Sequence, residues 1–163
     1  MIRSLLVVLI GCSVPVSLPA QSVSETEVQA SLYRVYGPGI EVDTLNAGTS
    51  AAYRVARNDS LLGWAVVRDV IGKDQPITFL VATDTTGVLW DVDILVYREP
   101  YGGEVAYEAW RKQFRGKGSD APLLVGRDIR NISGATISTH AVTAGVRQAL
   151  ADVAAWRRDG LLR

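Results

Sequence analysis

Apolar residues recur along the chain at two different spacings, and the first spacing is that of an α-helix. In residues 25–36 the apolar positions recur every three or four residues, at Val28, Leu32 and Val35 or Tyr36. This spacing predicts a short amphipathic helix over 25–36, which Gly37-Pro38-Gly39 ends. The segment 40–50 that follows includes Asn46-Ala47-Gly48, which favours a turn. Residues 21–50 are therefore interpreted as an N-terminal helix and a linker.

The second spacing is typical of β-strands and fills the centre of the chain. Runs rich in β-branched and aromatic residues are separated by polar turns at Asp59-Ser60, at 72–76 and at 83–87. Three or four such runs joined by short turns predict an antiparallel β-meander. Trp64 and Trp90 lie within two of the runs, and we expect both to pack on the sheet.

Helical spacing returns after the last β-rich run. A tight glycine-rich loop, Glu99-Pro100-Tyr101-Gly102-Gly103, precedes six residues at helical spacing: Val105, Ala106, Ala109, Trp110, Gln113 and Phe114. A longer helix is predicted from Ser138 to about Arg158, with one apolar face made of Val142, Val146, Ala149, Leu150 and Val153. A meander packed against a few helices indicates an α+β fold of a single domain.

Length and charge restrict the classes of function. The chain has 163 residues, of which 48% are hydrophobic and 21% charged, so it can form one hydrophobic core. Its 17 basic residues balance 17 acidic residues, giving a formal net charge of +0. A nucleic-acid partner is therefore not expected, because phosphate recognition needs a basic face.

The first 20 residues are typical of a secretory leader. Arg3 precedes an apolar run from Leu5 to Ile10, which is too short for a transmembrane helix. Two processing routes fit the sequence: cleavage after Ala20, or lipid attachment to Cys12 within Leu9-Ile10-Gly11-Cys12, which resembles a bacterial lipoprotein box. Both routes predict export to the periplasm or another extracytoplasmic space.

Few residues are available for metal or thiol chemistry. Cys12 is the only cysteine, which excludes a disulfide, a cysteine metal site and a thiol mechanism. His140 is the only histidine, so no metal site is expected. Asp91 and Asp93 share one face of a predicted strand, and that face is interpreted as solvated.

Small and hydroxylated residues are concentrated at the entrance of the last predicted helix, in the sequence RNISGATISTHAV over 130–142. One interpretation is structural: Ser133 or Thr136 caps the helix, Gly134 allows a tight turn, and Ala135 permits close packing. That role accounts for two or three of the six residues. The alternative is an anion site, where the helix N-terminus binds a phosphate that small residues allow to approach. A hydroxyl at its centre could be esterified to the phosphate.

The segment ISGATIST, residues 132–139, resembles the S/T-G-A-T motif of the FMN-binding domain family. That family includes the periplasmic flavin-carrying subunits of the sodium-pumping NADH:quinone reductase and of the Rnf complex. The resemblance implies that a flavin transferase joins FMN through a phosphoester to the last threonine of the motif, here Thr136. It covers the body of the chain, and the FMN-binding domain is expected over 51–158.

A second landmark of the family is a strand followed by a Glu-containing, glycine-rich loop, which ILVYREPYGGEV at 94–105 resembles. Better-known members read close to E-T-P-G there, and EPYGGE departs from that pattern. The resemblance implies two groups of cofactor-binding residues: Ser133, Gly134, Ala135, Thr136, Ser138 and Thr139 around the motif, and Glu99, Tyr101, Gly102 and Gly103 in the loop.

Other polar residues near the motif have both a functional and a structural interpretation. His140 would tune the flavin or lie on the helix surface, and Arg127 or Arg130 would neutralise the phosphate or remain a surface charge. A hydrolase triad of Ser133, His140 and Asp128 is not expected, because no nucleophile elbow surrounds the serine.

The resemblance as a whole implies an exported flavoprotein that carries covalent FMN and transfers electrons outside the cytoplasm. Its partners would be the flavin transferase and a redox partner of unknown identity, soluble or membrane-bound. Two alternatives stay open: a flavin-dependent reductase subunit, and a cofactor-free extracytoplasmic binding module of the same fold.

Overall fold

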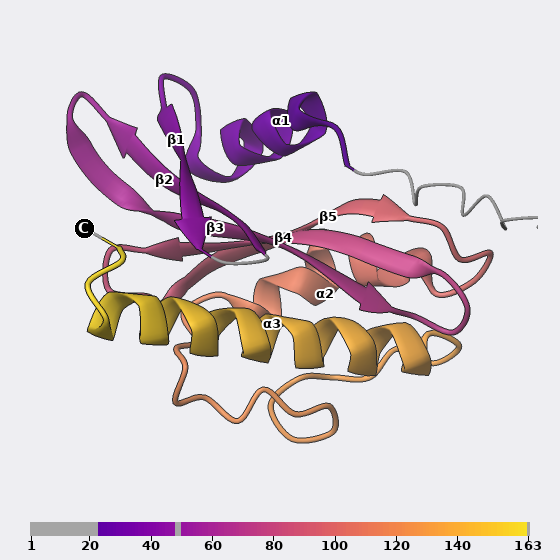
Figure 1. Cartoon of the computed structure of the whole chain (residues 1–163). Coiled ribbons are helices and arrows are strands. Elements are labelled where there is room, and N and C mark those ends of the chain that lie inside the picture. The colour runs from indigo at the N-terminus through magenta and orange to yellow at the C-terminus, as the bar shows by residue number, and fades with distance from the viewer. Residues whose placement is uncertain (1–22, 48–49, 163) are drawn as a thin grey trace, which may run out of the picture.

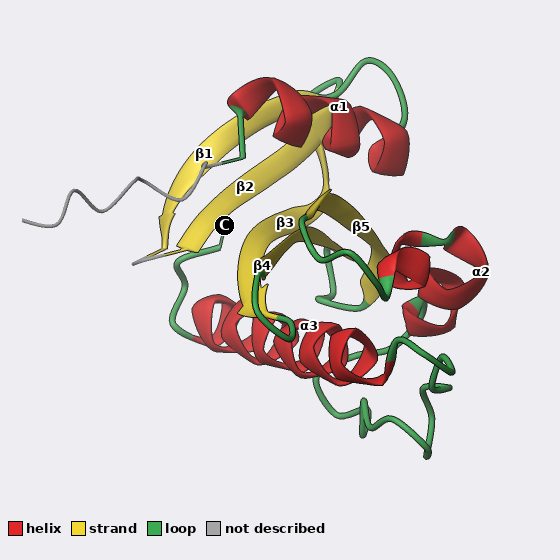
Figure 2. Cartoon of the chain, turned by 90° about the vertical axis from the view of Figure 1, so that its right-hand side faces the viewer, coloured by secondary structure: helices red, strands yellow, loops and turns green. Residues whose placement is uncertain are grey.

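Five antiparallel strands form one sheet in chain order, β1-β2-β3-β4-β5, in a computed structural model that describes residues 23–47 and 50–162 (Figure 1). The strands are β1 (Glu41–Ala47), β2 (Ser50–Arg57), β3 (Ser60–Ile71), β4 (Pro76–Asp84) and β5 (Leu89–Tyr97). Helix α1 (Glu25–Tyr36) lies on one face of the sheet and helix α3 (Thr136–Arg158) on the other (Figure 2). The expected α+β fold with an antiparallel meander is confirmed.

The turns of the meander follow from local sequence. Asn58 and Asp59, with φ of 49° and 60°, join β2 to β3 as a two-residue turn. Positive φ at both central positions is typical of the hairpin turn that matches strand twist, and Asn and Asp tolerate it. Between β3 and β4, Gly72 N donates to Gln75 O at 2.9 Å. These contacts fix a register in which Arg57 faces Ser60 and Ile71 faces Pro76.

Strand β1 corrects the interpretation of residues 40–50 as a linker. It pairs with β2 in antiparallel register from Glu41↔Ala56 to Ala47↔Ser50. The two apolar residues that it contributes, Val42 and Leu45, pack against different clusters, Val42 beside α1 and Leu45 beside Trp64. Val42 and Leu45 are separated by an odd number of positions, so they lie on opposite faces of the strand. The sequence of β1 therefore lacks the alternation of apolar and polar residues that predicts a strand. The turn expected at 46–48 falls partly outside the described residues.

Helix α1 has the bounds that the sequence predicts. Ser24 and Glu27 form a capping box: Glu27 N donates to Ser24 Oγ at 3.2 Å, and Ser24 N donates to Glu27 Oε2 at 2.9 Å. At its other end Tyr36 Oη lies 2.9 Å from Trp64 O and 2.8 Å from Thr83 O. The helix is therefore capped at its start and hydrogen-bonded to the sheet at its end.

Residues 103–114 differ from the single helix that their spacing predicts. They form three short turns: η1 (Gly103–Ala106), α2 (Glu108–Arg111) and η2 (Lys112–Phe114). The break comes at Tyr107, whose backbone is extended with φ −70° and ψ 131°. Val105, Trp110 and Phe114 are nevertheless buried, whereas Ala109 of the same pattern is exposed, so the apolar pattern predicts the inward residues only in part.

The two tryptophans expected on the sheet differ in burial. Trp64 is 4% exposed and belongs to the core, as expected. Trp90 is 42% exposed, and its ring packs edge-on against Tyr36 at 5.2 Å between centroids. The expectation is therefore only partly correct for Trp90.

No helix in the described part of the chain is long and apolar enough to cross a membrane.

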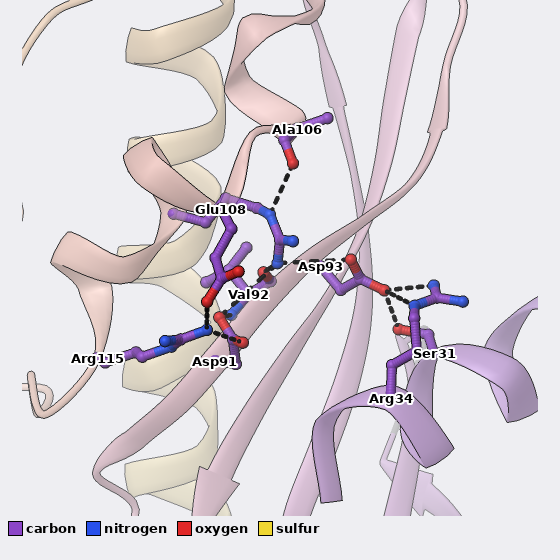
Figure 3. Close-up of polar contacts among 9 residues, drawn as sticks. Ser31, Arg34, Asp91, Val92, Asp93, Ala106, Glu108 and Arg115 are labelled. Carbon is purple, nitrogen blue, oxygen red and sulfur yellow. Dashed lines mark hydrogen bonds and ion pairs between the residues drawn. The ribbon is translucent and has the colours of Figure 1, made fainter. Parts of the chain in front are cut away.

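The face that Asp91 and Asp93 share is covered, not solvated (Figure 3). Asp93 accepts hydrogen bonds from Ser31 Oγ at 2.7 Å and from Arg34 of α1, and Arg111 Nη1 lies 3.4 Å away. Asp91 pairs with Arg115 at 2.8 Å. The solvated interpretation is wrong because α1 and residues 103–115, distant in the chain, bring compensating charges onto this face.

Replacing Asp93 by alanine should destabilise the fold. The change leaves the largely buried Arg111 without one of its carboxylates and Ser31 without its acceptor, so we expect a loss of about 3 kcal/mol in the free energy of unfolding. The matched control is Asp43→Ala, because Asp43 is exposed and its pair with Arg54 is 3.3 Å long. That change should cost less than about 0.5 kcal/mol. Urea unfolding followed by tryptophan fluorescence measures both, and equal losses would contradict the assignment.

Candidate functional site

Helix α3 begins at Thr136, two residues earlier than predicted, and none of the described side chains caps it. Its N-cap is Ala135, whose φ of −119° and ψ of 23° follow a tight turn at Gly134 with φ of +85°. The turn expected at Gly134 is therefore present, but the side-chain cap expected from Ser133 or Thr136 is not. Because the first N–H groups of a helix have no partner within it, the start of α3 presents backbone donors.

The hydroxyl of Thr136 stands at this helix start. Thr136 is exposed, and Asn131 Nδ2 donates a hydrogen bond to its Oγ1 at 3.1 Å. The residue also lines a cleft of about 330 Å³, called here the Thr136 cleft. Thr136 is therefore an exposed residue with a hydrogen-bonded hydroxyl, and it borders a cavity large enough for part of a small molecule.

Three segments far apart in the sequence form the Thr136 cleft. They are the β3–β4 turn, the segment that follows β5, and the first turn of α3. The lining residues are Lys73, Asp74, Glu99, Pro100, Tyr101, Gly134, Ala135, Thr136, Ile137 and Ser138. The cleft thus joins one ammonium group, two carboxylates, an exposed aromatic ring and an uncapped helix start.

Glu99 holds the β3–β4 turn in place. Its Oε1 accepts hydrogen bonds from Asp74 N at 2.6 Å and Gln75 N at 2.9 Å. These backbone donors stabilise the ionised form, and they lower the pKa of the Glu99 carboxyl below its ordinary value. The carboxylate therefore serves to fix Lys73 and Asp74 at the mouth of the cleft.

Tyr97, at the end of β5, joins the glycine-rich loop to α3. Its Oη donates to Tyr101 O at 2.5 Å and lies 2.8 Å from Ser138 Oγ. A Cβ at Gly102 would stand 2.6 Å from Tyr97 Oη and 2.8 Å from Ser138 Oγ, and the φ of this residue is +91°. Only glycine fits both the space and the backbone conformation, so the loop reaches α3 because residue 102 has no side chain.

Most of the expected cofactor-binding residues lie at the cleft. Gly134, Ala135, Thr136, Ser138, Glu99 and Tyr101 line it, and Gly102 contacts two of these residues from behind. Three others lie elsewhere. Ser133 is exposed in the preceding turn, Gly103 starts η1 beside the Tyr97 ring, and Thr139 is fully buried with its hydroxyl donating to Ala135 O at 2.8 Å.

The charged candidates around the motif are not part of the cleft lining. His140 is exposed on α3, and Arg127 and Arg130 line a separate cavity. Desolvation raises the pKa of the Asp128 carboxyl, but hydrogen bonds from Leu124 N, from Lys117 and from Leu123 N outweigh it and lower the pKa below its ordinary value. The cation at the Thr136 cleft is instead Lys73.

Sequence reasoning missed several residues of the site, chiefly Lys73, Asp74, Tyr97, Asn131 and Ile137. Lys73 and Asp74 are ordinary turn residues in the sequence, and only the pairing of β3 with β4 and the contact with Glu99 bring them to the cleft. Asn131 had a usable signal, because it is a polar residue directly before the turn that leads to Thr136.

Comparison with known proteins identifies this region. Residues 72–151 match the model of the FMN-binding domain family, a span that contains every segment of the Thr136 cleft. The chain is also similar to a subunit of the proton-translocating ferredoxin:NAD(+) oxidoreductase complex of Clostridium ljungdahlii, with 25% identity over 145 residues that cover 85% of this chain and 78% of that protein. The resemblance to the FMN-binding domain family is therefore confirmed over residues 72–151.

Proposed function

We propose that this protein is an exported flavoprotein that carries FMN covalently, as a phosphoester of Thr136, and transfers electrons outside the cytoplasm. The observation that carries the proposal is the exposed Thr136 hydroxyl at an uncapped helix start, inside the span that matches the FMN-binding domain family. A flavin transferase would make the bond, and the redox partner would be a component of a larger electron-transfer assembly. The similarity to one component of a ferredoxin:NAD(+) oxidoreductase complex supports this kind of partner.

The residues at the cleft fit an FMN phosphate. A phosphodiester keeps one negative charge, which the helix dipole and the free N–H groups of the first turn of α3 stabilise. Lys73 adds a positive charge at the same mouth. The absence of a side chain at Gly134 lets the phosphate approach the backbone, so the donor set agrees with an anion at this position.

The rest of the cleft fits an attached aromatic ring. Tyr101 and Ile137 are 83% and 52% exposed, and both line the cleft beside Pro100. Apolar side chains that are exposed around a cleft can pack on a planar ring and remove apolar surface from water. When bound, FMN supplies the redox chemistry, accepting and releasing electrons, while these residues bind and orient it.

Covalent attachment suits a protein outside the cell interior, since a dissociable cofactor is lost by dilution there. Attachment requires a donor with a phosphoanhydride bond, such as a flavin dinucleotide. Thr136 Oγ1 forms a bond to the flavin phosphorus, the anhydride bond breaks, and a nucleoside monophosphate leaves. The hydroxyl proton passes to a base of the transferase, and no oxidation or reduction occurs.

The attachment site is tested by intact mass. We expect the wild-type chain, produced in a host that has the transferase, to gain the mass of one FMN less one water. Thr136→Ala should carry no added mass, because the accepting oxygen is gone. Ser133→Ala, which removes an exposed hydroxyl three residues away, should retain it. A flavin that stays on the Thr136→Ala chain would disprove the proposal, as would a wild-type chain without flavin.

The role of Glu99 is tested by hydrogen exchange. Glu99→Ala removes the acceptor of two backbone hydrogen bonds, so the amides of Asp74 and Gln75 should exchange at least about tenfold faster. Glu104→Ala, which alters an exposed glutamate outside the cleft lining, should leave those amides unchanged. The folded-state pKa of Glu99 is lowered, so its contribution is present above the ordinary glutamate pKa and is lost as the pH falls through the lowered value. Protection that is independent of Glu99 and of acid would contradict this role.

The export route is tested at the N-terminus, which lies outside the described residues. Cleavage after Ala20 predicts a mature chain that begins at Gln21, whereas the lipoprotein route predicts a mature chain that begins at lipidated Cys12. Mass spectrometry of the protein from a bacterial envelope fraction distinguishes the two. Cys12→Ala should change the mature mass only on the lipid route. A chain that keeps Met1 and stays in the cytoplasm would contradict export.

A further inference from the structure

Asn131 contacts the proposed acceptor oxygen from a well-anchored backbone. On one side of it, Arg130 N donates to Gln113 Oε1 at 2.8 Å, and Arg130 O accepts from Trp110 Nε1 at 2.7 Å. On the other side, the partly buried Ile132 packs against the main core cluster. Although the Asn131 side chain is exposed, its Cα is therefore held between a buried tryptophan and the core.

The hydrogen bond of Asn131 is not a helix cap. A capping asparagine accepts a hydrogen bond from a backbone N–H of the first turn through its side-chain oxygen. Asn131 instead donates through Nδ2 to the Thr136 side chain, and the described part of the chain supplies no side-chain cap for α3. The contact therefore fixes the hydroxyl and leaves the backbone donors of α3 available.

We propose that Asn131 is a positioning residue for flavin attachment, which fixes the orientation of Thr136 Oγ1 and stabilises the negative charge that develops on it as its proton is removed. The inference rests on the proposed function. The Nδ2 donor occupies a lone pair of Oγ1, so the hydroxyl proton must point elsewhere and can pass to the transferase base. As the transferase base takes this proton, negative charge develops on Oγ1, and the same donor faces that charge until the bond to phosphorus forms.

The donor geometry makes a distinct prediction for each substitution at this position. Asn131→Ala removes the donor, and the turnover of attachment at saturating donor should fall about tenfold, as expected for a hydrogen bond to a developing charge. The Michaelis constant for the flavin dinucleotide should change by less than about twofold, because the bond acts on Oγ1. Asn131→Asp puts a carboxylate beside Oγ1 and the incoming phosphate, so attachment should be slower still at neutral pH. It should recover as the introduced carboxyl is protonated and becomes a donor.

The experiment uses full-length chain made without the transferase, purified transferase and a flavin dinucleotide. Initial rates of adduct formation are followed by intact mass and by covalent flavin fluorescence. Gln148→Ala is the matched control, because Gln148 is also an exposed amide that donates across the surface, to Asp152 at 3.0 Å, but it lies near the middle of α3. Thermal unfolding of each flavin-free variant separates slow attachment from a loss of fold.

The outcomes separate this inference from the proposed function. Slow Asn131→Ala and slower, acid-recovering Asn131→Asp, with wild-type rates in Gln148→Ala, support it. Wild-type rates in both Asn131 variants, while Thr136→Ala gains no flavin, overturn the role of Asn131 alone. An Asn131→Asp chain that reacts as fast as wild type at neutral pH also overturns it, because the amide would then act as an acceptor. Flavin on Thr136→Ala would instead remove the proposed function.

Discussion

The candidate site depends on the contact between the end of β5 and the start of α3. Tyr97 carries this contact, since its hydroxyl meets both Tyr101 O and Ser138 Oγ, and the missing side chain at Gly102 lets the two segments approach. Everything at the cleft is placed relative to this point: Glu99 and the turn that it holds on one side, Thr136 on the other. A local change at Tyr97 would therefore alter the position of groups that lie far away in the sequence.

The sequence predicts the elements that have a clear period and a clear end. Helix α1, the meander and the apolar face of α3 are such elements, because their apolar residues recur regularly between glycine, proline or polar turns. Strand β1 has no such period, since Val42 and Leu45 face opposite sides. The environment of Asp93 was equally beyond local reasoning, because the arginines that meet it belong to α1 and to residues 103–115.

The same distinction applies to the site. The local sequence indicated two stretches of the site, the small residues before Thr136 and the glycine-rich loop. Ten residues there were expected to bind the cofactor, and all but three of them line or contact the cleft. Lys73 and Asp74 could not be predicted, because only the folded sheet brings their turn to Glu99. The start of α3 is where local rules are least followed: α1 has a complete capping box, whereas α3, with Ala135 as its N-cap, has no side-chain cap. Violations of this kind are expected where a protein binds something else.

Arg111 also covers part of the outer edge of the sheet at β5. An edge strand presents unpaired backbone groups that can recruit a strand from another molecule. Here the guanidinium of Arg111 donates to Val92 O, Asp91 Oδ1 accepts from Val92 N, and residues 116–117 hydrogen-bond to both backbone groups of Leu89. Side chains and one short loop thus occupy the place of a sixth strand along residues 89–92 of β5. At the opposite edge, β1 exposes Glu41 and Asp43, whose like charges would repel the same edge of a second copy, so the sheet is protected from edge-to-edge aggregation at both ends.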